Sequence, residues 1–489
     1  MELLIAGIDG GTAEIFDAFD MPFWQKLRAS AKLLDVEEDI VQRGWARILS
    51  GQGAEENGGL YMMPKLDGTR DFTPKFGYKE MSSARGFAPI WKFAQDAGQS
   101  IGLMNIPTTS PAQKVDGFYV AGGGGGIFQG GLPDDALYPS SAQEILERNG
   151  YIFDIRLGAE GFQTIPELCD RLEKMMVART DSFIELAKTH GIGFGFLAYR
   201  ATTVLLYLAM SEIAFASDGP RGKTDRASWS PEWLPHLDRH FRTLDQCLER
   251  LFTELSPKHH LIVSDHSMVP WTHNVDFNGF LAAQGLSRYD LGPKDRARNL
   301  MRVVARPRFR ARLSRTPLSR IPGMLSSDGG RIRPDAPAFS APYVHGFYIN
   351  DAKRFGGPIA EENIEAEVNR LVALFNWETM QAQIPMRAAP YRANYEGAPK
   401  ADLMPDIKIH QSGFAFPIWL GENWYEPNPD FAPVTSILGV SGMHSGQKGD
   451  RPVLMADQGL ADLVEPGDPM DLRLAHLLTK RLYASSSSQ

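Results

Sequence analysis

The sequence has few of the features that mark several common classes of protein. It contains only two cysteines, Cys169 and Cys247, which excludes a disulfide scaffold and a cysteine-rich zinc site. It contains no run of about 18 apolar residues, so it predicts no membrane-spanning helix. The net charge of −8 gives no excess of basic groups for binding nucleic acid or an anionic membrane.

Two further signals are also missing. The N-terminal segment MELLIAGIDGG has no basic region and only a short apolar run, so we interpret it as a first strand rather than a secretion signal. The glycine-rich residues 122–126 lack the GKS or GKT ending of a phosphate-binding P-loop and are interpreted as a flexible loop. The apolar fraction of 43% is enough for a sizeable core. We therefore expect a soluble, cytoplasmic globular protein.

Short apolar runs alternate with longer amphipathic segments. Four runs that end in a polar or glycine-containing turn are predicted to be buried strands: residues 3–8, 101–104, 203–210 and 261–263. Helical periodicity predicts helices over residues 21–31, 165–190, 234–255 and 361–375. This alternation predicts an α/β fold with a largely parallel central sheet.

The predicted domain organisation is simple. We expect residues 1–484 to form one α/β domain, residues 287–340 to be an inserted Arg/Pro-rich or cap segment within it, and residues 485–489 to be a disordered tail. The stretch 296–333 within the insertion is interpreted as a solvated surface segment rather than an anion-binding flap, because scattered charge is usually surface.

Polar side chains follow several of the predicted strands. Asp9 ends the first strand, Asp265 and His266 directly follow the strand HLIV, and Glu212 follows residues 203–210. Ligands of such sheets bind beyond the carboxyl ends of the strands. Carboxylates and imidazoles suit zinc or manganese, and His444, in the loop SGMHSG, could join them.

Carboxylates this close together repel one another unless a cation lies between them or one takes up a proton. A divalent metal ion would remove that repulsion. Arg43 or Arg47 could do the same, and this is the main competing explanation.

The chain resembles type I phosphodiesterases/nucleotide pyrophosphatases of the alkaline phosphatase superfamily, and in particular their bacterial phosphohydrolase/phosphomutase branch. The resemblance covers nearly the whole chain and rests on the order of several motifs: GIDGG, GWARILSG, GLMNIPTTSPAQKVDGFYVAGG, SDHSMVPWTHNVDFNGFLAAQGL, HGFYIN and SGMHSG. It implies an alkaline-phosphatase-like three-layer sandwich with inserted cap segments.

The resemblance also implies a pair of metal sites. Asp9, Asp265 and His266 match three ligands of one site, and His444 matches a late histidine of the other. That other site normally also takes an Asp and a His four residues apart. The segment SEIAFASD is the best match, and it puts alanine at residue 214 and Asp218 in the His position; alternatively, the pair lies elsewhere, for instance around residue 225.

Other positions of the family pattern are kept or changed. By the same resemblance, Asn105 and Arg43 are expected to contact the substrate. The nucleophilic Thr of the family lies four residues before the tryptophan that is Trp45 here, and that position is Val41. A valine can neither attack phosphorus nor bind a metal. The family's His in the following loop is replaced by Asn57.

The resemblance therefore implies a metal-dependent hydrolase or transferase that acts on a phosphate, phosphonate or similar small anionic ester. Its cofactor would be zinc or manganese, in a remodelled site without the usual nucleophile. The alternative is a catalytically inactive relative that is kept for binding a ligand or a partner protein. Retention of Asp9, Asp265, His266 and His444 together favours the enzyme.

Overall fold

A computed structural model describes the chain except for residues 124–132, 134, 156, 158–161, 163, 214, 217–218, 221–231, 288–332, 412–414, 419–422, 433, 435–442 and 487–489. Most of the predicted insertion, 287–340, and the proposed ligand Asp218 lie outside the described residues, as do residues 214 and 225 and most of the glycine-rich loop.

An eight-stranded sheet forms the centre of the molecule. Its order is β2 (Ala31–Leu33), β21 (Leu454–Asp457), β11 (His259–Val263), β1 (Leu3–Ile8), β8 (Phe194–Tyr199), β5 (Ile101–Met104), β6 (Gly117–Val120) and β7 (Leu137–Tyr138). The five strands from β11 to β6 are parallel, and the strands outside them are antiparallel to their neighbours. The central strands are buried on both faces, which explains their continuous apolar sequences.

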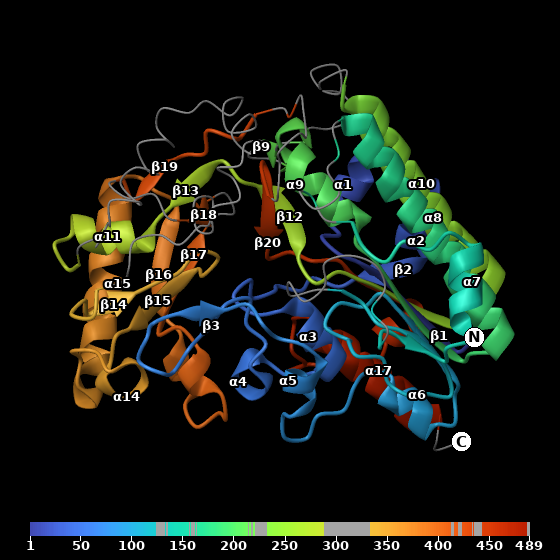
Figure 1. Cartoon of the computed structure of the whole chain (residues 1–489), viewed down its shortest axis with the longest axis horizontal. Coiled ribbons are helices and arrows are strands. Elements are labelled where there is room, and N and C mark those ends of the chain that lie inside the picture. The colour runs from blue at the N-terminus through green and yellow to red at the C-terminus, as the bar shows by residue number, and fades with distance from the viewer. Residues whose placement is uncertain are drawn as a thin grey trace.

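Two helical layers cover this sheet (Figure 1). One consists of α1 (Ala13–Ala18), α2 (Pro22–Ser30), α7 (Ala142–Arg148), α8 (Ile165–His190), α9 (Ala201–Ile213) and α10 (Leu234–Leu255). The other contains α3 (Gly44–Ser50), α5 (Tyr78–Ser82), α6 (Lys92–Asp96), α16 (Gln458–Ala461) and α17 (Arg473–Ser486). Each helical layer encloses one apolar core against the sheet, and alternate side chains of β1 belong to different cores. Leu4, Ala6 and Ile8 lie in the core of the first layer, and Leu3 and Ile5 lie in that of the second. The predicted three-layer α/β sandwich with a largely parallel central sheet is confirmed.

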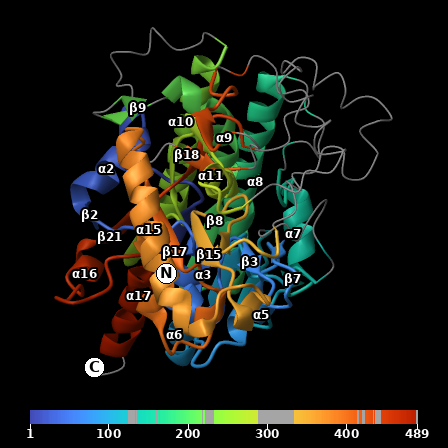
Figure 2. The ribbon, with the colours of Figure 1, turned by 90° about the vertical axis from the view of Figure 1, so that its left-hand side faces the viewer.

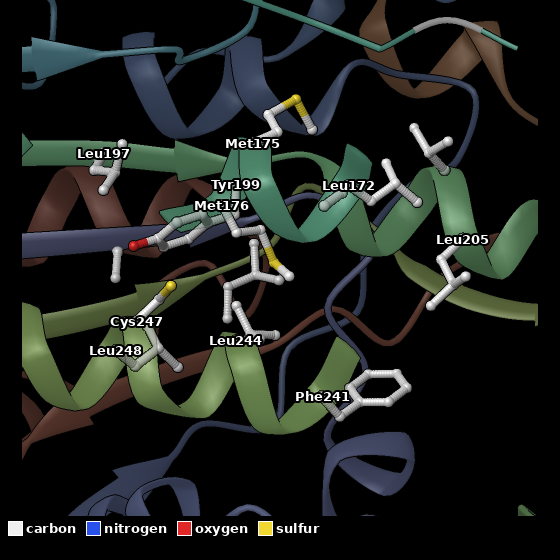
Figure 3. Close-up of a cluster of buried hydrophobic side chains, with 14 of the residues drawn as sticks. Leu172, Met175, Met176, Leu197, Tyr199, Leu205, Phe241, Leu244, Cys247 and Leu248 are labelled. Atoms are coloured by element: carbon white, nitrogen blue, oxygen red, sulfur yellow. The ribbon is translucent and has the colours of Figure 1, made fainter. Parts of the chain in front are cut away.

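The first core is densest where α8 and α10 pack together over β8 (Figure 3). Met176 of α8 points toward Leu244 of α10 across this contact, with Cys247 and Leu248 nearby on α10. Both cysteines are free and buried.

The expected strand over residues 203–210 is wrong. The strand is β8, which lies just before this stretch, and residues 203–210 belong to helix α9. Nearly every residue of α9 is buried, so the helix is apolar all round and lacks the periodicity that distinguishes a helix from a buried strand. Glu212 therefore lies near the end of a helix and not at the end of a strand.

A smaller lobe extends from this sandwich between β13 (His273–Val275) and β19 (Tyr425–Pro427). Its antiparallel sheet has the order β14 (Ala338–Phe339), β15 (Gly346–Ile349), β17 (Ile407–Gln411), β16 (Met386–Pro390). Helix α15 (Ile364–Gln381) lies across that sheet (Figure 2), and the lobe has its own apolar core. The expected helix over 361–375 is thus confirmed but extends further, after a short 3₁₀ turn.

Two boundaries complete the description. Helix α17 continues through Ser486, two residues beyond the expected end of the domain, and packs on α3. Among the described residues, no helix is both long and apolar enough to cross a membrane.

Candidate metal centre

The parallel register of β1 and β11 brings two carboxylates together. Gly7 pairs with Val263, and Asp9 and Asp265 each lie two residues further along their strands. One ligand atom from each of Asp9, Asp265 and His266 lies within 4.8 Å of the other two. All three side chains are buried, as their shared position at the strand ends led us to expect.

The loop after β1 is held tightly against the loop after β11. Gly10 has φ +73°, and a Cβ there would approach Met268 and Thr203 to about 3 Å, so the position requires glycine. The Thr12 hydroxyl donates to the Gly10 carbonyl and accepts the backbone N–H of Met268. These contacts fix where Asp9 points.

The tautomer of the His266 ring follows from the group that its Nδ1 contacts. Nδ1 lies 2.8 Å from the carbonyl oxygen of Ser267, which can only accept, so Nδ1 carries the proton. The lone pair of Nε2 therefore faces the carboxylates, at 3.4 Å from Asp265 Oδ2 and 3.6 Å from Asp9 Oδ1. Among the described residues, neither Nε2 nor Asp265 Oδ1 has a hydrogen-bond partner.

These distances fit a metal ion better than a hydrogen bond. They are longer than ordinary N–H···O bonds. Ligands bound tetrahedrally at about 2.0–2.1 Å lie about 3.3–3.4 Å from one another, close to the separations seen here. Two oxygens and one imidazole nitrogen form a ligand set that suits zinc or manganese. The residues present therefore fit a single divalent ion.

Burial and mutual repulsion shape the electrostatics of the cluster. Burial, and then the neighbouring Asp9, raise the pKa of Asp265 well above its usual range, while Lys448 opposes the shift. Burial lowers the pKa of His266 to about 3, so the ring is neutral and able to bind a metal. A divalent ion would relieve the repulsion that the two carboxylates otherwise impose.

Of the Lys and Arg side chains that the structure describes, Lys448 is the one that forms an ion pair with a carboxylate of the cluster. It lies on β20 (Gly446–Gly449), which pairs with β12 (Ser267–Pro270) directly after the Asp265–His266 turn. Its Nζ lies 3.9 Å from Asp265 Oδ2 and 4.0 Å from the centre of the Tyr61 ring. Burial lowers the pKa of Lys448, and Asp265 and Asp9 oppose that shift.

Helix α9 contributes a pair of side chains one turn apart. The hydroxyl of Thr203 bonds the sulfur of Met268 and also interacts with the Tyr207 hydroxyl. Burial raises the pKa of Tyr207, and the charge of Asp9 raises it further. Arg200, directly after β8, pairs with Asp154 at 2.8 Å.

Trp45 and Gly44 anchor α3 against the cluster. The indole Nε1 of Trp45 donates to Asp9 Oδ2 at 3.2 Å, so this residue holds one oxygen of the carboxylate directly. A Cβ on Gly44 would lie 2.0 Å from the carbonyl oxygen of Asp265, so only glycine allows the helix to approach this closely. Val41, three residues before the helix, is buried in an apolar cluster with Leu60, among others.

The arginines that the sequence offered as competing cations have other partners. Arg43 donates to the carbonyls of Leu60, Tyr61 and Pro74. Arg47 pairs with Glu38 and Asp471. The local counter-charge at Asp265 comes instead from Lys448.

Two other expected site residues lie in different surroundings. The amide of Asn105 donates to the Phe153 carbonyl and accepts from the Tyr151 hydroxyl. His444 does not belong to the group of ligand atoms within 4.8 Å; its titration is influenced by Asp430, and its backbone bonds the carbonyl of Tyr207. Lys448, four residues after His444 and on strand β20, is the residue that pairs with Asp265.

Three residues near the cluster were not indicated by the sequence: Lys448, Tyr207 and Thr203. The i, i+4 spacing of Thr203 and Tyr207 equals the Asp-x-x-x-His spacing of the family pattern. However, neither threonine nor tyrosine by itself indicates a metal ligand in a sequence. Correct assignment of β8 would have pointed to them, because they follow that strand directly.

Comparison with solved structures agrees with this fold. Phosphonoacetate hydrolase from Sinorhizobium meliloti 1021, solved with phosphonoacetate, is similar at a TM-score of 0.51 and 11% sequence identity, over 99% of this chain and 95% of that one. Murine ectonucleotide pyrophosphatase/phosphodiesterase 5, an inactive variant in complex with AMP, matches at a TM-score of 0.45 and 11% identity, over 99% and 95% of the two chains. No protein-family model and no curated protein matches the sequence. The resemblance to the alkaline phosphatase superfamily is thus confirmed at the level of the fold.

Proposed function

We propose that Asp9, Asp265 and His266 hold one divalent ion, zinc or manganese, and that the chain hydrolyses or transfers a small phosphate, phosphonate or similar anionic ester. The observation that carries this proposal is the arrangement of the three ligand atoms: the Nε2 lone pair of His266 faces two carboxylates at 3.4 and 3.6 Å, which is longer than an ordinary hydrogen bond. A divalent ion bound there supplies a Lewis acid and lowers the pKa of a bound water.

The protein's own residues prepare this site. The Ser267 carbonyl holds His266 in the tautomer that leaves Nε2 free for a metal, and the Trp45 indole fixes the orientation of Asp9. The partly exposed side chains of Lys448 and Arg200, at 25% and 27% exposure, put positive charge at the edge of the buried cluster. Positive charge there favours an anionic substrate.

The site we propose is remodelled relative to the two-metal pattern. Because residue 41 is a valine packed among apolar side chains, we assign the attack to water rather than to the side chain at the family's nucleophile position. His444 and Asp218 were expected to serve a second ion. The first does not join the cluster, and the second lies outside the described residues.

Metal content is the direct test. Protein purified without chelators is expected to carry about one zinc or manganese per chain, and added zinc is expected to raise its thermal midpoint. Asp265→Asn should abolish both effects. Asp245→Asn is the matched control, because Asp245 is equally buried but accepts the backbone N–H groups of Phe23 and Trp24, away from the cluster.

The outcome decides between the enzyme and its alternative. Phosphate release from phosphonate or phosphate esters by the metal-loaded chain, lost in Asp265→Asn, supports the enzyme. A chain that binds metal and inorganic phosphate but turns over none of these esters is the inactive binding relative. An unchanged metal content in Asp265→Asn would overturn the metal site itself.

A further inference from the structure

The electropositive neighbour of the metal cluster is a lysine on a strand. Lys448 pairs with Met268 in the register of β12 and β20, so its backbone is fixed only two residues from His266 in the partner strand. Its Nζ lies 3.9 Å from Asp265 Oδ2, the same oxygen that faces His266 Nε2 at 3.4 Å. One carboxylate oxygen thus faces both the expected ion position and an ammonium group.

The ring of Tyr61 holds that ammonium group in place. Nζ lies 4.0 Å from the ring centre, within the range of a cation–π contact. Through this contact with Lys448, the Tyr61 ring lies beside the cluster. Lys448 thus contacts both a carboxylate and an aromatic ring, and these two contacts restrict the position of its ammonium group.

In the part of the chain that the structure describes, the rest of this side of the cluster offers few ligands to a second divalent ion. Thr203 and Tyr207 are the α9 side chains that approach Asp9 and its loop, and both are neutral hydroxyl groups. Among the described residues, no second group of three or more His, Cys, Asp or Glu side chains has its ligand atoms this close together. A second divalent ion beside Lys448 would also meet repulsion from the ammonium.

We infer that Lys448 is the second cation of this site: the cluster takes a single divalent ion, and the Lys448 ammonium both neutralises Asp265 and binds an oxygen of the anion held at that ion. This inference rests on the proposed function and adds the metal stoichiometry and an anion-positioning residue. An ammonium is a point charge with three donors, which suits a phosphate or phosphonate oxygen.

Three measurements on the full-length chain test this role: bound zinc per chain, zinc affinity by chelator competition, and binding of inorganic phosphate to the zinc-loaded protein by calorimetry. Lys448→Met keeps the length of the apolar stem and removes the charge. Lys448→Arg keeps the charge. Lys353→Met is the matched control, because Lys353 is exposed and pairs with Glu361 in the smaller lobe.

The wild-type chain is expected to bind one zinc. Lys448→Met should still bind one zinc, more tightly by roughly tenfold because a positive neighbour is lost, and should bind phosphate roughly tenfold or more weakly. Lys448→Arg should keep most of the phosphate affinity, and Lys353→Met should match the wild type. If Lys448→Met does not fold, Lys448→Gln provides the same comparison.

The results separate this inference from the proposed function. Two zinc ions in the wild type, unchanged phosphate affinity in Lys448→Met, or weaker zinc binding in that variant would each overturn the role of Lys448 and leave the metal site standing. A wild-type chain that binds no zinc or manganese would overturn both.

Discussion

The indole Nε1 of Trp45 donates a hydrogen bond of 3.2 Å to Oδ2 of Asp9, the carboxylate that follows the first strand. The other oxygen of Asp9 faces His266 Nε2. One oxygen is thus held by the protein and the other is turned toward the proposed ion. This is the usual arrangement of a ligand whose orientation is fixed by a neighbouring donor.

Loss of that donor should weaken metal binding without unfolding the chain. Trp45→Phe is expected to reduce zinc affinity by roughly 10- to 100-fold, because the ligand carboxylate loses the group that orients it. Chelator competition measures the change. Trp24→Phe is the control: Trp24 is also fully buried and its indole also bonds a carboxylate, that of Asp17, but away from the cluster. Equal effects of the two substitutions would contradict the role given to Trp45.

Restoring the family's nucleophile should not restore its chemistry. Val41→Thr is expected to cost about 1–3 kcal/mol of unfolding free energy, because it places a hydroxyl in an apolar cluster without an evident partner. No phosphorylated protein should form with nitrophenyl phosphate mono- or diesters, in the wild type or in the variant. Urea unfolding and acid-trapped phosphoprotein provide the two readouts. A trapped phosphoprotein in the wild type would show that another residue is the nucleophile.

The sequence predicted the fold and the clustering of Asp9, Asp265 and His266. The positions of Asp9, Asp265 and His266 could be predicted because each directly follows a short apolar run, and parallel strands end at one edge. The wrong strand over residues 203–210 arose because a helix buried on all sides has no apolar stripe. Because of that error, the sequence did not indicate that Thr203 and Tyr207 lie near the cluster.

Lys448 could not be found from sequence for a different physical reason. Its approach to Asp265 depends on the antiparallel pairing of two four-residue strands nearly 180 residues apart, and neither strand is strongly apolar. His444 had the more suggestive residue type, but the register of that pairing selects the residue four positions later.

A buried histidine outside the site should make stability depend on pH. His240 is fully buried on α10 with Nε2 near the Thr202 hydroxyl, and burial lowers its pKa from 6.5 to about 3. The folded state keeps this ring neutral, while the unfolded state takes up a proton below about pH 6.5. Stability is therefore intact above about pH 6.5 and falls as the pH drops toward 3.

The size of this effect can be measured with one variant. At about pH 5 the linkage costs the wild type about 2 kcal/mol relative to about pH 7.5, and His240→Gln should lack this increment whatever its effect at neutral pH. Urea unfolding at the two pH values gives the comparison, with His190→Gln, at the end of α8, as the control. Parallel losses in the wild type and His240→Gln would show that His240 is not the group responsible.

The last prediction concerns the closest backbone approach at the site. Gly44 is the first residue of α3, and a Cβ there would lie 2.0 Å from the carbonyl oxygen of Asp265. Helix propensity alone would make Gly44→Ala stabilising by up to about 1 kcal/mol. The contact reverses this sign, because neither the helix nor the turn after β11 can give way without displacing Asp265. We expect Gly44→Ala to lower the unfolding free energy by about 1–3 kcal/mol and to weaken zinc binding at the same time. Gly459→Ala in α16 is the control, because the three atoms nearest to its new Cβ belong to the side chains of His259 and Asp457 and not to the backbone. Calorimetric unfolding with and without zinc separates the two effects: a variant that loses stability but keeps its full stabilisation by zinc would show that α3 can be displaced without moving Asp265.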